Sequence, residues 1–372
     1  MRIGVPKEVK NHEYRVAITP AGTHEAVRHG HEVVLEKGAG LGSSIPDDAY
    51  VAAGATILAD ADEVWDAADL LLKVKEPIAE EYPRLRADQV LFTYLHLAAD
   101  QKCTQAILGS GITALAYETV QLADGSLPLL APMSEVAGRL APQVGAFAMM
   151  RPSGGRGVLP GGVPGVAPAD VVVIGGGVSG ENAARIALGL GASVTVLDLD
   201  VARLRHIDAQ FAGRVRTLAS SAYVIEKAVL EADMVIGAVL VPGAKAPTLV
   251  SNELVSRMKP GAVLVDIAID QGGCFEDSRP TTHDDPTFRV HDTVFYCVAN
   301  MPGAVPSTST NALTNVTLPY LLRIADLGWT DALRQDAALA PALNAHDGSL
   351  TNASVAQAHG LESVTLESVL AG

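Results

Sequence analysis

The residues best placed to do chemistry are three glycines and one aspartate. Gly175, Gly177 and Gly180 lie in the run VVVIGGGVSG at 171–180, and Asp198 ends the later segment SVTVLD. The first glycine permits a tight strand-to-helix turn, the second lets the backbone approach a pyrophosphate, and the third lets the helix pack on the strand. With a strand before it, a helix after it and an acid at the next strand end, this pattern predicts a dinucleotide site rather than a plain packing turn.

The helix that follows this turn would contribute its first backbone amides, those of Val178 and Ser179, together with the positive end of its dipole. Asp198 can accept the protons of both ribose hydroxyls and would repel a 2′-phosphate, which favours NAD over NADP. Arg203 and Arg205 follow closely and leave NADP open. A nicotinamide cofactor in turn predicts hydride transfer.

A second group of candidates lies in the first third of the chain. Lys75 follows LLLKV, His96 follows VLFTY, Glu118 follows ITALAY, and Arg15 lies in KNHEYRVAITP. Strand ends of a parallel sheet meet at one edge, where an arginine and a lysine suit a small carboxylate and a histidine suits proton transfer. The alternatives are a hydrogen-bonded structural histidine, a solvated lysine and a surface pair of Arg15 with Glu13.

Two further segments follow expected strands of the second half. In VLVDIAIDQGGCFE at 263–276, a carboxylate, Asp270, could face the nicotinamide; the alternative is an aspartate that caps a loop, which is common before glycines. Asn300, in CVANMPG, could bind the carboxamide, and the loop 237–247 could cover the adenosine. No metal-ligand spacing is recognisable, so we expect no metal.

Composition bounds the class of protein. A chain of 372 residues is long enough for two domains. Hydrophobic residues make up 48% of it and aromatic residues only 4%, a composition that favours α/β sheets built from Val, Ile, Leu and Ala. A net charge of −15 argues against nucleic acid and anionic membranes as partners. Three widely spaced cysteines indicate reduced thiols. We see no signal peptide, and no apolar run is long enough to span a membrane, so we expect a cytoplasmic protein.

The fold that we expect to position these residues is α/β, with two doubly wound Rossmann-like domains and a cleft between them. We expect strands at 2–5, 32–36, 70–74, 90–94 and 112–117 in the first domain, and at 171–174, 193–198, 214–218, 234–237, 262–266 and 294–297 in the second. A helix should begin at Ser134 as its N-cap, and the Gly/Pro-rich stretch 151–168 is either a linker or an ordered loop. The tail is expected to be helical from about residue 306 and to rejoin the first domain, giving a substrate domain of 1–130 plus 305–372 and an NAD-binding domain of 131–304.

Several blocks of the chain resemble the bacterial L-alanine dehydrogenase family. They are EYRVAITPAG, LLLKVKEP, FTYLHLAA, PMSEVAGRLA, VLVPGAKAP, VDIAIDQGGCFE and CVANMPGAVP, and the resemblance runs from Met1 to about Gly328. It implies NAD-dependent oxidative deamination of L-alanine to pyruvate and ammonia, the reverse amination, two Rossmann-like domains and a homohexamer. Some members hold a divalent cation with a glutamate equivalent to Glu118 and a histidine in the tail helix; here the corresponding RIADLGW has no histidine.

The resemblance also implies residue roles. Arg15 and Lys75 would bind the substrate, and His96 and Asp270 would form the catalytic acid–base pair. The residues implied to line the cofactor, besides the glycine turn, are Ser134, Asp198, Arg203, Ser220, Val239, Leu240, Ile267, Asp270, Arg279, Val298, Asn300 and Met301. Two other functions stay open: the NAD-binding subunit of proton-translocating transhydrogenase, which presents NAD(H) to a partner, and a saccharopine or lysine-pathway dehydrogenase, which would turn over a long diamino acid.

Overall fold

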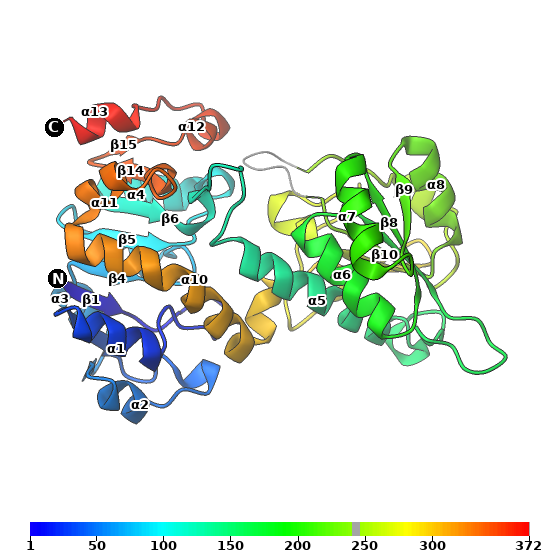
Figure 1. The fold of residues 1–372 in the computed structure, drawn as a ribbon, viewed down its shortest axis with the longest axis horizontal. Helices are drawn as coiled ribbons and strands as arrows, with labels where there is room; N and C mark the ends of the chain where they lie inside the picture. The colour runs from blue at the N-terminus through cyan, green and yellow to red at the C-terminus, as the bar shows by residue number, and fades with distance from the viewer. Residues whose placement is uncertain (240–245, 372) are drawn as a thin grey trace. The chain divides into compact units, whose positions relative to one another are not determined.

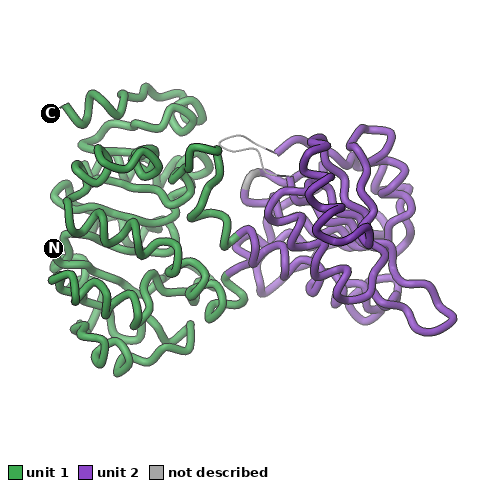
Figure 2. The backbone as a smooth tube through the Cα atoms, viewed as in Figure 1, with its two compact units in different colours: residues 1–133, 303–372 green, residues 134–302 purple. Residues whose placement is uncertain are grey.

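The computed structural model describes residues 1–239 and 246–371. They form two compact units, one of Met1–Met133 with Gly303–Gly372 and one of Ser134–Pro302 (Figure 2). The first unit is therefore built from two separate stretches of chain, and the second is inserted between them.

Unit 1 contains an eight-stranded sheet of order β15-β14-β6-β5-β4-β1-β2-β3. The six strands from β6 to β3 are parallel, and their neighbours in the sheet are often distant in sequence. Their bounds are β1 Arg2–Val5, β2 Glu32–Glu36, β3 Thr56–Leu58, β4 Leu70–Leu72, β5 Val90–Thr93 and β6 Thr113–Ala116. Because the chain moves from β1 to β2 on one side and returns to β4 on the other, the loops after β1 and β4 flank a topological switch point.

The helices of unit 1 lie between these strands and in the tail (Figure 1). Thr19 caps the first helix by accepting from the amide of Gly22, and Pro20 occupies the first helical position, as the sequence predicts. The bounds are α1 Pro20–Arg28, α2 Asp47–Ala52, α3 Ala61–Ala67, α4 Gln101–Ser110, α10 Pro306–Leu327, α11 Trp329–Gln335, α12 Ala353–His359 and α13 Leu366–Leu370.

The expectation of a wholly helical tail is wrong in one place. Two strands, β14 Leu343–His346 and β15 Ser349–Leu350, form an antiparallel hairpin, and β14 adds antiparallel to β6 at the edge of the sheet. The hairpin turns at Asp347 and Gly348, whose φ angles are 44° and 75°. An Asp-Gly pair with two positive φ angles is a strong hairpin turn, and it overrides the helical character of its surroundings.

Unit 2 contains a seven-stranded sheet of order β12-β13-β11-β10-β7-β8-β9, parallel except for β12. The strands are β7 Asp170–Ile174, β8 Ser193–Asp198, β9 Arg216–Ala219, β10 Met234–Gly237, β11 Val263–Asp266, β12 Thr287–Val290 and β13 Thr293–Tyr296, and the helices are α6 Val178–Gly189, α7 Val201–Phe211, α8 Ala222–Glu231 and α9 Asn252–Ser256. Val171 and Val173 join one core cluster while Val172 and Ile174 join another, so β7 is buried on both faces. The predicted α/β class with two Rossmann-like sheets is confirmed.

Two segments near the start of unit 2 bear on the expectations from the sequence: one begins earlier than expected, and the other is one of the two structures considered. Helix α5 spans Ala131–Ala148, so Ser134 lies inside its first turn and is not the N-cap; Pro132 suits that earlier start because its missing amide has no helical partner there. The Gly/Pro-rich stretch 151–168 is an ordered loop. Its Arg156 pairs with Asp233 at 3.2 Å and donates its backbone amide to the carbonyl of Gly261.

Candidate active site

The turn after β7 carries the three glycines of the sequence pattern, and the backbone explains each one. Gly175 has a φ of 100°, and a Cβ there would lie 2.7 Å from the carbonyl oxygen of Ala238. At Gly180 a Cβ would lie 1.8 Å from the carbonyl oxygen of Gly175, so α6 can begin this close to the strand only with glycine. The nearest described atom to a Cβ at Gly177 would be Nη1 of Arg203, at 4.0 Å. The backbone of Gly177 is therefore open to the close approach of a pyrophosphate.

Asp198 supports this turn from the end of β8. One carboxylate oxygen accepts the amide of Gly176 at 2.7 Å, and the other accepts the amide of Asp200 at 2.8 Å. Arg203 lies 3.4 Å from the same carboxylate, with its side chain half exposed. Each carboxylate oxygen has further lone pairs, so Asp198 can accept ribose hydroxyls while it holds the turn. These features fit a bound dinucleotide.

Five more predicted cofactor residues of unit 2 follow the carboxyl ends of its parallel strands. Ser220 follows β9 and donates its amide to the carbonyl of Asp198 at 2.9 Å. Val239 follows β10, Ile267 follows β11, and Val298 and Met301 follow β13. Ligands of open parallel sheets lie outside this edge, so the placement fits the same ligand as the glycine turn. Val298 and Met301 are buried, so their side chains shape the loop from within.

Three other predicted cofactor positions differ in character. Asn300 adopts a φ of 68°, a conformation uncommon outside glycine, and its carbonyl oxygen lies 3.3 Å from Nε2 of His283. Arg279 is exposed, and its guanidinium lies 4.4 Å from the centre of the Phe288 ring, a cation–π contact within unit 2. Leu240 lies outside the described residues.

The two aspartates after β11 have different environments. Asp266 is fully buried; its carboxylate accepts the amides of Ala268 and Cys274 at 3.0 and 2.9 Å and the hydroxyl of Ser278 at 2.5 Å. Burial raises the pKa of Asp266, and these hydrogen bonds oppose the rise. The loop-capping role that the sequence analysis weighed for Asp270 thus belongs to Asp266. Asp270 is exposed in the short helical segment Ile267–Gln271 and remains available to a ligand.

In unit 1, Arg15 lies in the loop after β1 and is only 2% exposed. It forms a buried ion pair with Glu13: Nη2 lies 2.5 Å from one carboxylate oxygen and Nε 2.7 Å from the other, and Nη1 lies 3.0 Å from Sδ of Met133. Burial disfavours the charge of Arg15, but Glu13 outweighs this effect and the pKa of the guanidinium is raised. The alternative of a surface pair is therefore wrong.

Lys75 follows β4 and is 7% exposed, so it is not the solvated lysine of the alternative interpretation. Its backbone is held by Glu8, which accepts the amides of Val74 and Lys75 at 2.5 and 3.4 Å. Lys73, fully buried, places Nζ 3.0 Å from Glu8 and 2.8 Å from Glu81. Burial raises the pKa of Glu8 although Lys73 opposes it, so the carboxylate is held in the core at a cost.

His96 follows β5 in the left-handed conformation, with φ 48° and ψ 34°. The carboxylate of Glu118, beside β6, accepts the amides of Leu95 and His96 at 3.1 and 2.7 Å, and its oxygen lies 3.9 Å from Nδ1 of His96. The imidazole stacks on the ring of Tyr94, with 5.8 Å between ring centres and 5° between planes. One third of the His96 side chain is exposed, which leaves it accessible for proton transfer.

The carboxylate of Glu76 lies within electrostatic reach of several cationic or titratable side chains of unit 1. Burial opposes its ionisation, yet Lys75, Lys10 and His96 together lower its pKa. Strands β1, β4 and β5 are parallel neighbours, so Arg15, Lys75 and His96, on the loops that follow them, lie at the carboxyl edge of one sheet. Such an edge suits a small carboxylic acid bound beside an imidazole.

Two of the acids that hold the buried cations, Glu8 and Glu81, are not among the residues singled out from the sequence, and Glu13 was expected there only as a surface partner of Arg15. The one available indication was Lys73 itself, a lysine inside the apolar run LLLKV, because a lysine in a buried strand needs a counter-ion. Within the described residues no group of three or more His, Cys, Asp or Glu side chains is arranged to hold a metal ion. Among the described helices, none has the length and apolar character that crossing a lipid bilayer requires.

Comparison with known proteins identifies the family. The model of the alanine dehydrogenase/PNT N-terminal domain matches residues 4–137, and that of the C-terminal domain matches residues 141–353. The chain belongs to the alanine dehydrogenase/PNT family. The predicted resemblance is thereby confirmed over most of the chain.

Individual members of this family are similar to the chain in sequence and in structure. An alanine dehydrogenase of Mycobacterium tuberculosis is 66% identical over 371 residues, covering 100% of both chains. A solved structure of an L-alanine dehydrogenase matches with a TM-score of 0.93 and 50% identity, covering 97% of this chain and 99% of that one. A transhydrogenase from Sinorhizobium meliloti matches with a TM-score of 0.80 and 26% identity, covering 95% and 100%. The similarity is thus greater to the alanine dehydrogenases than to this transhydrogenase.

Proposed function

We propose that this chain catalyses the NAD-dependent oxidative deamination of L-alanine to pyruvate and ammonia, and the reverse reductive amination. The observation that carries the proposal is that the buried cations Arg15 and Lys75 lie at one sheet edge with the partly exposed His96, in a chain that is 66% identical to an alanine dehydrogenase over its full length. The forward reaction consumes L-alanine, NAD⁺ and water and yields pyruvate, ammonium, NADH and a proton.

The residues of unit 1 would bind and orient the amino acid. Arg15, fixed by Glu13, would pair with the substrate carboxylate, since a held guanidinium recognises a carboxylate with little loss of entropy. Lys75 would bind the carboxylate and, in the keto acid, polarise the carbonyl. Enclosing these charges away from water strengthens each interaction and supplies much of the expected acceleration.

The residues of unit 2 would hold the cofactor. The glycine turn would bind the pyrophosphate, and Asp198 with Arg203 would bind the adenosine ribose. Ser134, Ser220, Val239, Leu240, Ile267, Arg279, Val298, Asn300 and Met301 would line the remainder. When bound, NAD⁺ supplies a hydride acceptor.

His96 and Asp270 would then move protons. After the Cα hydrogen has left as hydride, the substrate is iminopyruvate, and water adds to its carbon. His96 would remove a proton from that water as it attacks and pass it to the nitrogen of the carbinolamine. It would then take the hydroxyl proton as the C–N bond breaks and ammonia leaves, while Asp270 would stabilise the positive charge on nitrogen. An imidazole suits this role because it exchanges protons near neutral pH.

The test is turnover by the purified chain, read as absorbance of the reduced cofactor. L-Alanine with NAD⁺ should be the productive pair in a panel that includes D-alanine, a long diamino acid and NADP⁺. His96→Ala should lower kcat far more than it weakens NAD⁺ binding, whereas His24→Ala, an exposed histidine on α1, should change neither. Equal loss of kcat and NAD⁺ binding with a melted fold would mark His96 as structural.

The second candidate is a module that only presents NAD(H) to a partner, as in the NAD-binding subunit of transhydrogenase. The fold match to the Sinorhizobium meliloti protein favours it. It gives no use to the buried cations and His96, and the absence of any amino-acid turnover, with tight NADH binding retained, would support it over the enzyme.

We further propose a cytoplasmic homo-oligomer, hexameric as the family resemblance implies. In support of a reducing compartment, Cys103, Cys274 and Cys297 are free, buried thiols. Light scattering at several protein concentrations would measure the assembly directly, and a monomer at all concentrations would contradict it.

A further inference from the structure

The C-terminal tail makes a direct contact with the segment that carries His96. His359, the last residue of α12, places its Nε2 atom 2.7 Å from the carbonyl oxygen of Leu97. A carbonyl oxygen only accepts hydrogen bonds, so Nε2 must carry the proton. Leu97 immediately follows His96 and is itself buried. The tail therefore restrains the peptide between Leu97 and Ala98, one residue beyond the candidate catalytic histidine.

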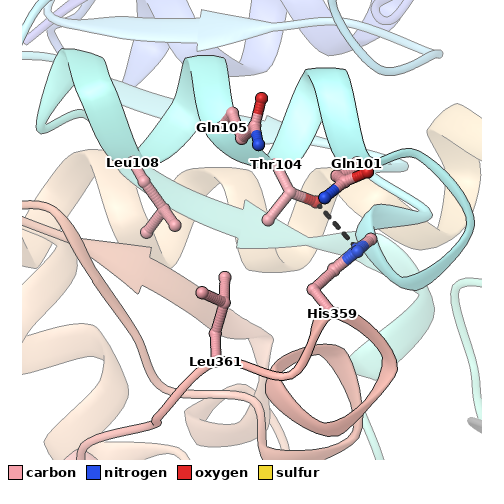
Figure 3. A pocket seen from close by; sticks show the side chains of 6 residues that line it. All are labelled: Gln101, Thr104, Gln105, Leu108, His359 and Leu361. Carbon is pink, nitrogen blue, oxygen red and sulfur yellow. Dashed lines mark hydrogen bonds between the residues drawn. The ribbon is translucent and has the colours of Figure 1, made fainter.

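A second donor reaches the same carbonyl from α4. The hydroxyl of Thr104 lies 2.9 Å from the oxygen of Leu97, 2.9 Å from the carbonyl oxygen of Asp100 and 3.4 Å from Nε2 of His359, so Leu97 and Asp100 share the single proton of that hydroxyl. Figure 3 shows the two side chains converging, with Gln101 and Gln105 on the same helix and Leu361 beyond the end of α12. The carbonyl of Leu97 thus accepts from the tail, from α4 and, at 3.1 Å, from the backbone amide of Asp100.

Helix α12 is itself well anchored. The side chain of Asn352 caps it by accepting the amides of Ser354 and Val355 at 3.0 and 3.2 Å. Val355 and Ala356 are buried in the same apolar cluster as Leu97. A hydrogen bond from a helix held in this way restrains its partner, because the donor cannot follow a drifting loop.

His96 needs this restraint because its backbone conformation is unfavourable. A φ of 48° is costly for a residue with a Cβ, and it persists only where the surroundings enforce it. On the N-terminal side Glu118 accepts the amides of Leu95 and His96. On the C-terminal side the amide of Ala99 donates to the carbonyl of His96 at 3.0 Å and the amide of Asp100 to the carbonyl of Leu97 at 3.1 Å, and His359 adds to Leu97 a donor from the tail.

We propose that His359 is a positioning residue for the reaction: its hydrogen bond to Leu97 holds His96 in the left-handed conformation and so sets the direction of the imidazole. The inference rests on the proposed function, since it assigns His359 a part in the same site. His359 acts through the backbone of Leu97 and takes no proton from the substrate.

The kinetic test compares His359→Ala with His359→Gln. Removing the donor should lower kcat about tenfold, as small misplacements of a catalytic group do, while the Kd for NAD⁺ stays unchanged. Glutamine keeps an N–H donor and should restore most of kcat. Gln105→Ala, exposed on the same stretch of α4, is the matched control and should behave as the unaltered chain. Wild-type kcat in His359→Ala, or equal losses in both variants with the fold intact, would overturn the proposal.

A readout that needs no turnover separates this inference from the proposed function. Diethyl pyrocarbonate modifies accessible imidazoles, and peptide mass spectrometry gives the rate at His96 alone. His359→Ala should raise that rate several-fold and His359→Gln should not, with circular dichroism confirming the fold of each. An unchanged rate at His96 refutes the positioning role even if L-alanine is turned over. An unaltered chain that fails to oxidise L-alanine refutes the proposed function, while the rates at His96 still decide the role of His359.

Discussion

The buried pair of Glu13 and Arg15 gives the sharpest prediction about stability. The side chains are 0% and 2% exposed, and three nitrogens of Arg15 (the backbone amide, Nε and Nη2) donate to the two oxygens of Glu13. Glu13→Ala would leave a guanidinium buried without its carboxylate, and breaking such a pair costs about 3–5 kcal/mol. With a slope of about 2 kcal/mol per molar urea, the unfolding midpoint should fall by about 1.5–2.5 M.

The chain supplies its own reporter and its own control. Both tryptophans, Trp65 and Trp329, lie in unit 1, so their fluorescence follows the unfolding of the unit that contains the pair. Glu25→Ala removes the partner of Arg28, a pair of side chains that are 36% and 64% exposed. Exposed pairs contribute about 0.2–1 kcal/mol, so this midpoint should fall by about 0.5 M at most.

The double variant Glu13→Leu/Arg15→Met completes the comparison. Because it removes both charges and keeps apolar volume, it should recover much of the stability that Glu13→Ala loses. It should not recover turnover, since Arg15 is the proposed carboxylate anchor. Equal unfolding midpoints for Glu13→Ala and Glu25→Ala, or a double variant as unstable as Glu13→Ala, would show that the instability of Glu13→Ala does not come from an uncompensated buried charge.

Three further predictions concern other parts of the molecule. Gly180→Ala should abolish NAD⁺ binding, measured by calorimetry, because its Cβ would lie 1.8 Å from a backbone oxygen. Gly189→Ala in the same helix meets no neighbouring atom within 4 Å and should raise the free energy of unfolding by about 0.5–1 kcal/mol. Burial raises the pKa of Cys103 and of Cys297 to about 12, so about one thiol in 10⁴ is ionised at pH 8. The reaction of these thiols with a disulfide reagent should therefore be slow in the native protein, become about tenfold faster per pH unit and be immediate in urea. Rapid labelling of the native protein at pH 8 would contradict this. Glu118→Gln should lower kcat about tenfold by weakening the hydrogen bonds that hold the His96 segment, seen in initial rates; an unchanged kcat would remove Glu118 from the positioning of that segment.

Features set by local backbone geometry could be predicted from the sequence. The spacing of Gly175, Gly177 and Gly180 encodes a turn whose sterics involve only the neighbouring strand ends, and each position fits its expected place. Strand β1 and the start of α10 at Pro306 match the expected positions for the same reason. Regular apolar runs and a proline carry this information within a few residues.

Features that depend on distant partners could not be predicted in this way. One counter-ion of Lys73 is Glu8, 65 residues away, and one donor to the carbonyl of Leu97 is His359, 262 residues away. No periodicity links such pairs, because their proximity comes from the order of strands in the sheet. The hairpin of β14 and β15 is an intermediate case: the Asp347–Gly348 pair is a sequence signal for a turn, but its strands are too short to be told from a loop.

The closing of the unit 1 sheet by β14 imposes an order on biosynthesis. The outer side of β6 stays without its neighbour until β14 has been made, after the whole of the intervening unit 2. Unit 2 can complete its fold during synthesis, while unit 1 waits with an open strand edge that invites pairing with other chains. A nascent chain truncated before residue 343 would therefore aggregate with other chains more readily than one that lacks a terminal helix.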